Sequence, residues 1–118
     1  MTPTKTARTI ISSASLTAGN TSSGTIDLRT TFGATITVRI TNGATGPTIA
    51  ATATINISTD NSTWRKLTAV QSNTGNNVVT DIPVNIDASV LYAQVSITGN
   101  TAQAVTVESY AHELTSIA

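Results

Sequence analysis

The sequence predicts an all-β protein, an antiparallel β-sandwich of about eight strands with a jelly-roll-like arrangement. Three observations predict this fold class. First, 25 Thr, 12 Ile and 9 Val make 46 of the 118 residues β-branched, and β-branched side chains favour pleated strands over helices. Second, apolar and polar residues alternate along much of the chain. Third, turn-forming residues recur at the short intervals that are typical of antiparallel sheets.

The alternation locates the strands. Segment 34–41 is the clearest, because Ile36, Val38 and Ile40 share one face while threonines and Arg39 occupy the other. Segments 51–57 and 91–97 repeat the pattern with Ala, Ile, Leu and Val inward. Five less regular strands are predicted at 9–16, 24–29, 64–70, 78–86 and 104–111. Pro83 is expected to break the strand at 78–86, since proline cannot donate to a ladder.

Two hairpins are expected from turn residues and register. A type I turn at Asp60 and Asn61 would place Trp64 opposite Ile57, where it would cover one end of the core. A loop with an odd number of residues around 99–101 would pair Val95 with Val105 and keep one face apolar, because a one-residue slip inverts every side chain. Phe32 is expected in the core together with Trp64.

The composition excludes several classes of protein. The six Lys and Arg balance the six Asp and Glu, and no basic cluster points to nucleic acid. The apolar runs are too short to span a membrane, and no apolar segment follows the basic residues 1–9 to form a signal peptide. There is no cysteine, hence no disulfide and no thiolate metal site. A thin core of Ala, Val and Ile leaves little room for a small-molecule substrate or a cofactor.

His112 is the one histidine and the natural candidate for a general base. Ser109 with Glu108 or Glu113 would complete a triad on paper. Hydroxyl side chains are so common in this chain that such a grouping carries little information, and no glycine-flanked nucleophile turn is present. We therefore expect no catalytic residue and no enzymatic activity.

Four acids fall in or beside predicted turns, namely Asp27, Asp60, Asp81 and Asp87. Calcium could collect oxygens there, but no Asp-x-Asp-x-Asp spacing occurs. Turn stabilisation by the carboxylates explains the same positions, and Asp27 is placed to pair with Arg29. No metal site is expected.

The outer faces of the predicted strands are rich in threonine and poor in charge. Such a face is either a solvated sheet or a flat surface that lies against another protein, and the low charge favours the second interpretation. A sugar-binding platform is less favoured, because the chain has only four aromatic residues.

Segments 25–33, 37–43 and 55–62, with Gly46-Pro47-Thr48 and Trp64, resemble small β-sandwich virion proteins of tailed bacteriophages. The resemblance covers about residues 24–70. It implies a capsid decoration (cement) protein, made in the host cytoplasm, that binds the exterior of the phage head and bridges neighbouring capsid subunits. The implied partner is the major capsid protein, and a homo-oligomer, with a trimer as one form, is expected. The alternative is a tail or fibre module that binds a host-surface glycan.

The chain is expected to consist of an N-terminal arm, residues 1–8, and a sandwich domain, residues 9–118. The arm would lie extended on capsid protein and add a strand or a line of backbone contacts. A lattice would supply many weak contacts at once. The expected contact residues are Thr2, Pro3, Thr4, Lys5, Thr6 and Arg8 in the arm and Leu114 and Ile117 at the C-terminus.

Overall fold

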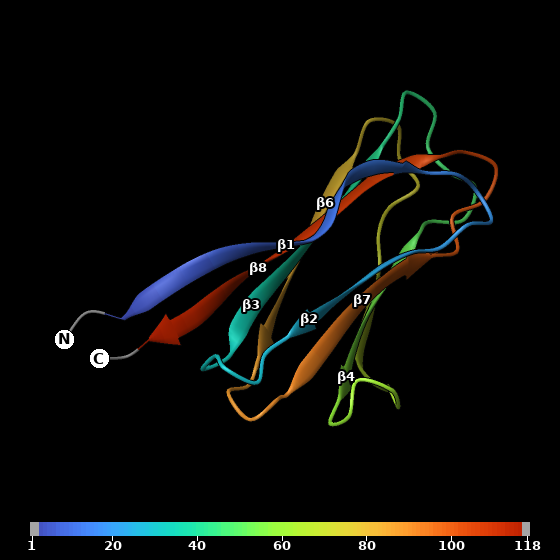
Figure 1. Ribbon diagram of the computed structural model, residues 1–118. Coiled ribbons are helices and arrows are strands. Elements are labelled where there is room, and N and C mark those ends of the chain that lie inside the picture. Colours follow the sequence, from blue (N-terminus) through green and yellow to red (C-terminus); the bar gives the residue numbers. More distant parts are fainter. Residues whose placement is uncertain (1–2, 117–118) are drawn as a thin grey trace.

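A computed structural model describes residues 3–116 as eight antiparallel strands, with no helix in that range. The fold class predicted from the sequence is confirmed (Figure 1). The strands are β1 (Thr4–Leu16), β2 (Ser22–Asp27), β3 (Ala34–Asn42), β4 (Thr52–Ser58), β5 (Arg65–Gln71), β6 (Val79–Ile86), β7 (Tyr92–Thr98) and β8 (Val105–Ser116).

The strands form two four-stranded sheets in jelly-roll order. Sheet A has the order β1-β8-β3-β6 and sheet B the order β2-β7-β4-β5. Only β4 and β5 are both consecutive in the chain and neighbours in one sheet; every other connection crosses from one sheet to the other. The molecule measures 48 × 31 × 18 Å, and its shortest dimension fits two sheets packed about 10 Å apart.

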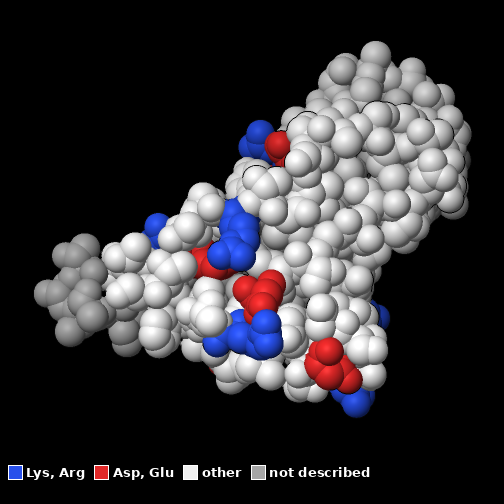
Figure 2. All heavy atoms as spheres, viewed as in Figure 1, with Lys and Arg blue, Asp and Glu red and all other residues white. Residues whose placement is uncertain are grey.

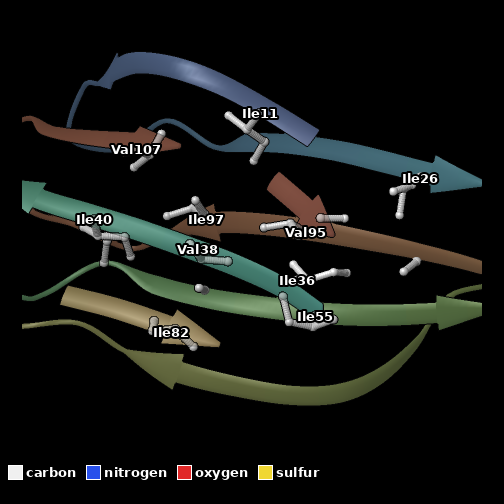
Figure 3. Close-up of a cluster of buried hydrophobic side chains, with 14 of the residues drawn as sticks. Ile11, Ile26, Ile36, Val38, Ile40, Ile55, Ile82, Val95, Ile97 and Val107 are labelled. Carbon is white, nitrogen blue, oxygen red and sulfur yellow. The ribbon is translucent and has the colours of Figure 1, made fainter. Parts of the chain in front are cut away.

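The core lies between the sheets and follows the predicted alternation. Ile36, Val38 and Ile40 of β3 face Ile55 of β4 and Val95 of β7 across the gap (Figure 3). Alanines at several inner positions allow the close approach of the sheets, including Ala51, Ala53, Ala93 and Ala111. The core is thin because its side chains are small, as the composition predicts.

The expected pairing of Val95 with Val105 is wrong. Val95 in sheet B pairs with Gly24 and Ile55, whereas Val105 in sheet A pairs with Leu16 and Asn42. Both valines are nevertheless buried. They face the same core from opposite sheets, so the inward positions were predicted correctly although the partner strand was not.

Three further expectations are corrected by the structure. Ile57 pairs with Arg65 and not with Trp64, which is half-buried just before β5 and is not part of the core. Pro83 does not break β6; β6 is the edge strand of sheet A, where a missing N–H can face solvent. Phe32 is outside the core, with 46% of its surface exposed.

One end of the sandwich carries no charge. The loops 17–21, 43–51, 72–78 and 99–104 contain no Asp, Glu, Lys or Arg. Amide side chains tie these segments together instead: Asn42 Nδ2 donates to the carbonyls of Asn73 (2.7 Å) and Gly75 (2.8 Å). Asn100 Nδ2 donates to the carbonyl of Leu16 at 3.2 Å. This end is therefore closed by hydrogen bonds, while the opposite end holds the termini (Figure 1).

Truncation of a core isoleucine tests the packing. Ile36 is fully buried, whereas Ile49 is 53% exposed. We expect Ile36→Ala to lower the free energy of unfolding by about 3 kcal/mol, because it leaves a cavity between the sheets. Ile49→Ala, the matched control, should change it by less than about 0.5 kcal/mol. Urea denaturation measures both, and similar losses for the two variants would contradict the placement of the core.

Candidate interaction surface

The N-terminal and C-terminal strands form a two-stranded ribbon that projects beyond the sandwich (Figure 1). The ribbon comprises residues 4–6 of β1 and 114–116 of β8, beyond the last pairing of β8 with β3 (Ala34 with Glu113); Lys5 pairs with Leu114 in it. Thr115 reinforces it, since its Oγ1 lies 3.1 Å from Thr6 Oγ1 and donates to the Thr4 carbonyl at 3.3 Å. The two expected contact segments are thus neighbours.

The expected contact residues lie in or beside this ribbon. Pro3 is exposed just before β1, and Thr4, Lys5, Thr6 and Arg8 are exposed within β1. Leu114 is half-buried in β8. Thr2 and Ile117 lie outside the described residues.

The outer edge of β1 is unpaired over its described length, because β1 is the first strand of sheet A. Register shifts interrupt its pairing between Thr4 and Lys5, between Thr9 and Ile11, and between Ile11 and Ala14. The longest regular stretch of the free edge is therefore residues 5–9, which starts in the ribbon and continues along the sandwich. A regular edge is a template for an added strand, and the irregularities place its longest uninterrupted stretch at the end of β1 nearest the ribbon tip.

Arg8 and Glu113 form an ion pair where the ribbon leaves the sandwich. Arg8 Nε lies 2.9 Å from Glu113 Oε1, and the Glu113 side chain is 0% exposed whereas that of Arg8 is 52% exposed. Apart from this ion pair, neither Glu113 oxygen has a hydrogen-bond partner among the described residues. The guanidinium is therefore the compensating charge for a buried carboxylate, and a buried charge without a partner is costly.

Asp27 and Arg29 pair beside the ribbon, as expected from the sequence. Arg29 Nη2 lies 2.8 Å from Asp27 Oδ2, and its Cζ stands 5.2 Å from the centre of the Tyr92 ring. Hydrogen bonds from Arg29 lower the pKa of Asp27 to about 2, and the charge of Arg8 acts in the same direction. Figure 2 shows positive and negative side chains interleaved on this part of the surface, whereas the end away from the ribbon is free of both colours.

The outer face of sheet A carries a second ion pair and an aromatic pair. Arg39 Nε lies 2.8 Å from Asp81 Oδ1, and this hydrogen bond lowers the pKa of Asp81. The rings of Tyr110 and His112 meet edge to face, with centroids 5.9 Å apart. These side chains stand among threonines of β3, so the face is flat and weakly charged.

The residues of the hypothetical triad are not brought together. Ser109 is buried on the inner face of β8 and donates to the Thr37 carbonyl at 3.0 Å. His112 is exposed on the outer face, while Glu113 is inward again. Alternation along one strand therefore separates Ser109 and Glu113 from His112.

The other candidate acids have local partners. Asp60 accepts from the backbone of Ser62 and Thr63, and Asp87 from that of Ser89. These contacts are the turn stabilisation expected from the sequence, and they lower the pKa of both carboxyls. Within residues 3–116, no group of three or more metal-ligating side chains is clustered. The described residues likewise include no helix that could cross a membrane.

The tyrosines do not form one platform. Tyr92 pairs with Asp27 and Ser58 on the outer face of sheet B, whereas Tyr110 belongs to sheet A. The exposed aromatic residue beside the ribbon is instead Phe32, whose N–H donates to the Leu114 carbonyl at 2.7 Å. Phe32 follows β2 in a Thr-Thr-Phe-Gly turn, and its position before a glycine is the one sequence signal that could have placed it on the surface.

The sequence matches no protein-family model and no curated protein. Solved structures share the fold. A chain in the structure of infectious bursal disease virus, Gx strain, has a TM-score of 0.58 and 15% identity over 95% of this chain and 32% of that one. The Yersinia pseudotuberculosis-derived mitogen has a TM-score of 0.56 and 8% identity over 96% and 87% of the two chains.

The enzymatically active domain of bacteriophage CBA120 tailspike protein 4 has a TM-score of 0.53 and 9% identity over 90% of this chain and 19% of that one. This chain thus spans less than two thirds of the two viral proteins that it resembles. At these identities the likeness establishes the β-sandwich fold, which viral, phage and bacterial proteins share.

The ion pair of Arg8 and Glu113 predicts unequal losses of stability. Arg8→Met leaves a buried carboxylate without its compensating charge and should cost about 3 kcal/mol. Glu113→Gln leaves an arginine that is half in solvent and should cost about 1 kcal/mol. Urea denaturation at neutral pH measures both. Lys66→Met, on exposed β5, is the control, because it removes a cation outside this ion pair. Equal losses of stability in Arg8→Met and Glu113→Gln would refute the role of Arg8 as the compensating charge.

The Asp27–Arg29 contact predicts an unusually acidic carboxyl. In an NMR titration, Asp27 should have its midpoint near 2, and Arg29→Met should return it towards 3.8. Because the pKa is lowered by folding, the stabilisation is complete above 3.8 and is lost as the pH falls towards 2. Asp87, which accepts from Ser89, should titrate identically in the wild type and the variant. An unchanged Asp27 midpoint would contradict the pairing.

Proposed function

We propose that this protein is a structural virion protein, a capsid decoration or cement protein that binds the outer surface of a phage head and bridges capsid subunits. The observation that carries the proposal is the projecting ribbon of β1 and β8, together with the regular free edge of β1 at residues 5–9 that starts in it. A strand edge that extends beyond its own sandwich can be reached by a second protein without rearrangement of the core.

Strand addition explains how such a ribbon would bind. The unpaired N–H and C=O groups of β1 would form a ladder with an extended segment of the major capsid protein. Exposed Thr4, Lys5 and Thr6 would flank that ladder. Each contact is small, but a protein that touches several subunits gains from multivalency. Bridging would thereby resist separation of the subunits.

The surface chemistry supports assembly. Charged residues make up 10% of the chain, against about 25% in ordinary soluble domains. A flat threonine-rich face loses little hydration energy when it lies against another protein, because it carries few charges to desolvate. The sandwiches that this chain resembles include a chain of a virus particle and a phage tailspike domain, which agrees with a place in a virion.

Co-sedimentation tests the proposal. The full chain should sediment with purified expanded heads of its phage and not with purified tails. Removal of residues 1–7, which keeps Arg8 in place, should leave a cooperatively unfolding domain whose binding to heads is at least about tenfold weaker. Binding to tails but not to heads would refute a head protein. Binding of an oligosaccharide from the host surface would instead favour the tail or fibre module.

Two proline variants test strand addition without shortening the chain. Successive residues of an edge strand direct their N–H groups to opposite sides. Of Thr6→Pro and Ala7→Pro, one therefore breaks the bond to β8 and the other alters only the free edge. The variant that retains wild-type stability should still lose most of its binding to heads. Full binding by that variant would exclude an added strand at this edge.

A further inference from the structure

A groove of about 580 Å³ lies on the outer face of sheet A at the base of the ribbon. Its apolar wall includes Phe32 and Leu114, and Lys5 and His112 also line it. It collects residues from β1, β3, β6, β8 and the connection between β2 and β3. The groove is therefore a product of the fold and not of one flexible loop.

The backbone fixes Phe32 beside this groove. The Phe32 N–H donates to the Leu114 carbonyl at 2.7 Å, and the Leu114 N–H donates to the Gly33 carbonyl at 3.1 Å. Gly33 has a φ of +91°, and a Cβ at this position would lie 2.7 Å from the Ile86 carbonyl oxygen. The backbone that carries the half-exposed ring is thus held in place before any partner arrives. Pre-organised aromatic side chains are the usual anchors of protein interfaces.

The charge around the groove has one sign. Lys5 contributes an ammonium group, and none of the residues that line the groove is acidic. The neighbouring acid on β8, Glu113, is buried on the opposite face and faces Arg8. Glu108 lies farther along β8, with its Oε1 3.9 Å from Arg39 Nε. A carboxylate brought into the groove would therefore meet a cation and no competing acid.

We propose that this groove binds an extended acidic peptide segment, with an apolar side chain against Phe32 and an adjacent carboxylate at Lys5. That the segment belongs to the capsid protein rests on the proposed function; the peptide chemistry does not. A peptide fits better than a saccharide, because the Thr35 hydroxyl already donates to Asn85 Oδ1 at 3.0 Å. The Thr35 hydroxyl and the Asn85 amide oxygen, which a sugar could otherwise contact, are thereby bonded to each other.

The peptide chemistry can be tested on the full chain in solution. The probes are acetyl-Gly-Asp-Leu-Glu-Gly-amide and the same peptide with Asn and Gln in place of its acids, titrated into ¹⁵N-labelled protein. The acidic peptide should shift the amides of Phe32, Gly33 and Leu114, and it should bind at least about fivefold more tightly than its neutral analogue. Equal binding of the two peptides, no shift at these amides, or shifts there with a neutral oligosaccharide panel would overturn the proposal.

Matched variants separate the groove from the rest of the surface. Phe32→Ala should abolish the peptide-induced shifts, while Leu67→Ala should leave them intact, although both side chains are 46% exposed. Lys5→Glu should weaken binding of the acidic peptide, and Lys66→Glu, the same charge change on β5, should not. If Phe32→Ala and Leu67→Ala bound the acidic peptide alike, the groove would not be the site.

Purified heads then identify the occupant. Phe32→Ala should reduce co-sedimentation at least about tenfold relative to Leu67→Ala. Failure of the wild type to bind heads would refute the proposed function but leave the peptide result to decide the groove. Binding of heads by Phe32→Ala as strongly as by Leu67→Ala would refute the capsid protein as the source of the segment.

Discussion

Pairing of the first strand with the last is the constraint on which the rest of the structure depends. β8 lies between β1 and β3 in sheet A, so the C-terminal strand connects the N-terminal strand to the centre of the sandwich. The same ladder continues past the last β3 pairing, of Ala34 with Glu113, and becomes the ribbon. The ion pair of Arg8 and Glu113 stands at this transition, where core packing gives way to a free two-stranded element.

Threonine covers the outer faces of the sheets and asparagine bonds the loops at one end, where other proteins often use charged side chains. Threonine keeps strand geometry on the outer faces while it exposes a hydroxyl. Asn42 and Asn100 are buried at one end of the sandwich and bond backbone carbonyls there. Small inner residues such as Ala53 and Ala93 keep the sheets close. The result is a thin, weakly charged body whose charged residues lie away from one end.

The sequence was sufficient to locate all eight strands and most of the inward residues of β3, β4 and β7, because alternation is a local signal. Leu91, which was expected inward, is 38% exposed because it precedes β7. The sequence was insufficient for strand partners: Val95 and Val105 are close in sequence but belong to different sheets, and crossing connections leave no local trace. The ribbon was missed at its C-terminal side because Glu113, a charged residue at an inward position, interrupts the apolar pattern. Phe32 was misplaced because apolar character alone does not distinguish a core side chain from an exposed one.

β1 begins and β8 ends at the tip of one ribbon, while the uncharged loops close the far end (Figure 1). A passenger domain fused ahead of β1 or after β8 would consequently lie beside the free edge of β1. An insertion into one of the uncharged loops would instead lie far from the ribbon. For display of a foreign epitope, the interior of the polypeptide is thus a better attachment point than its ends.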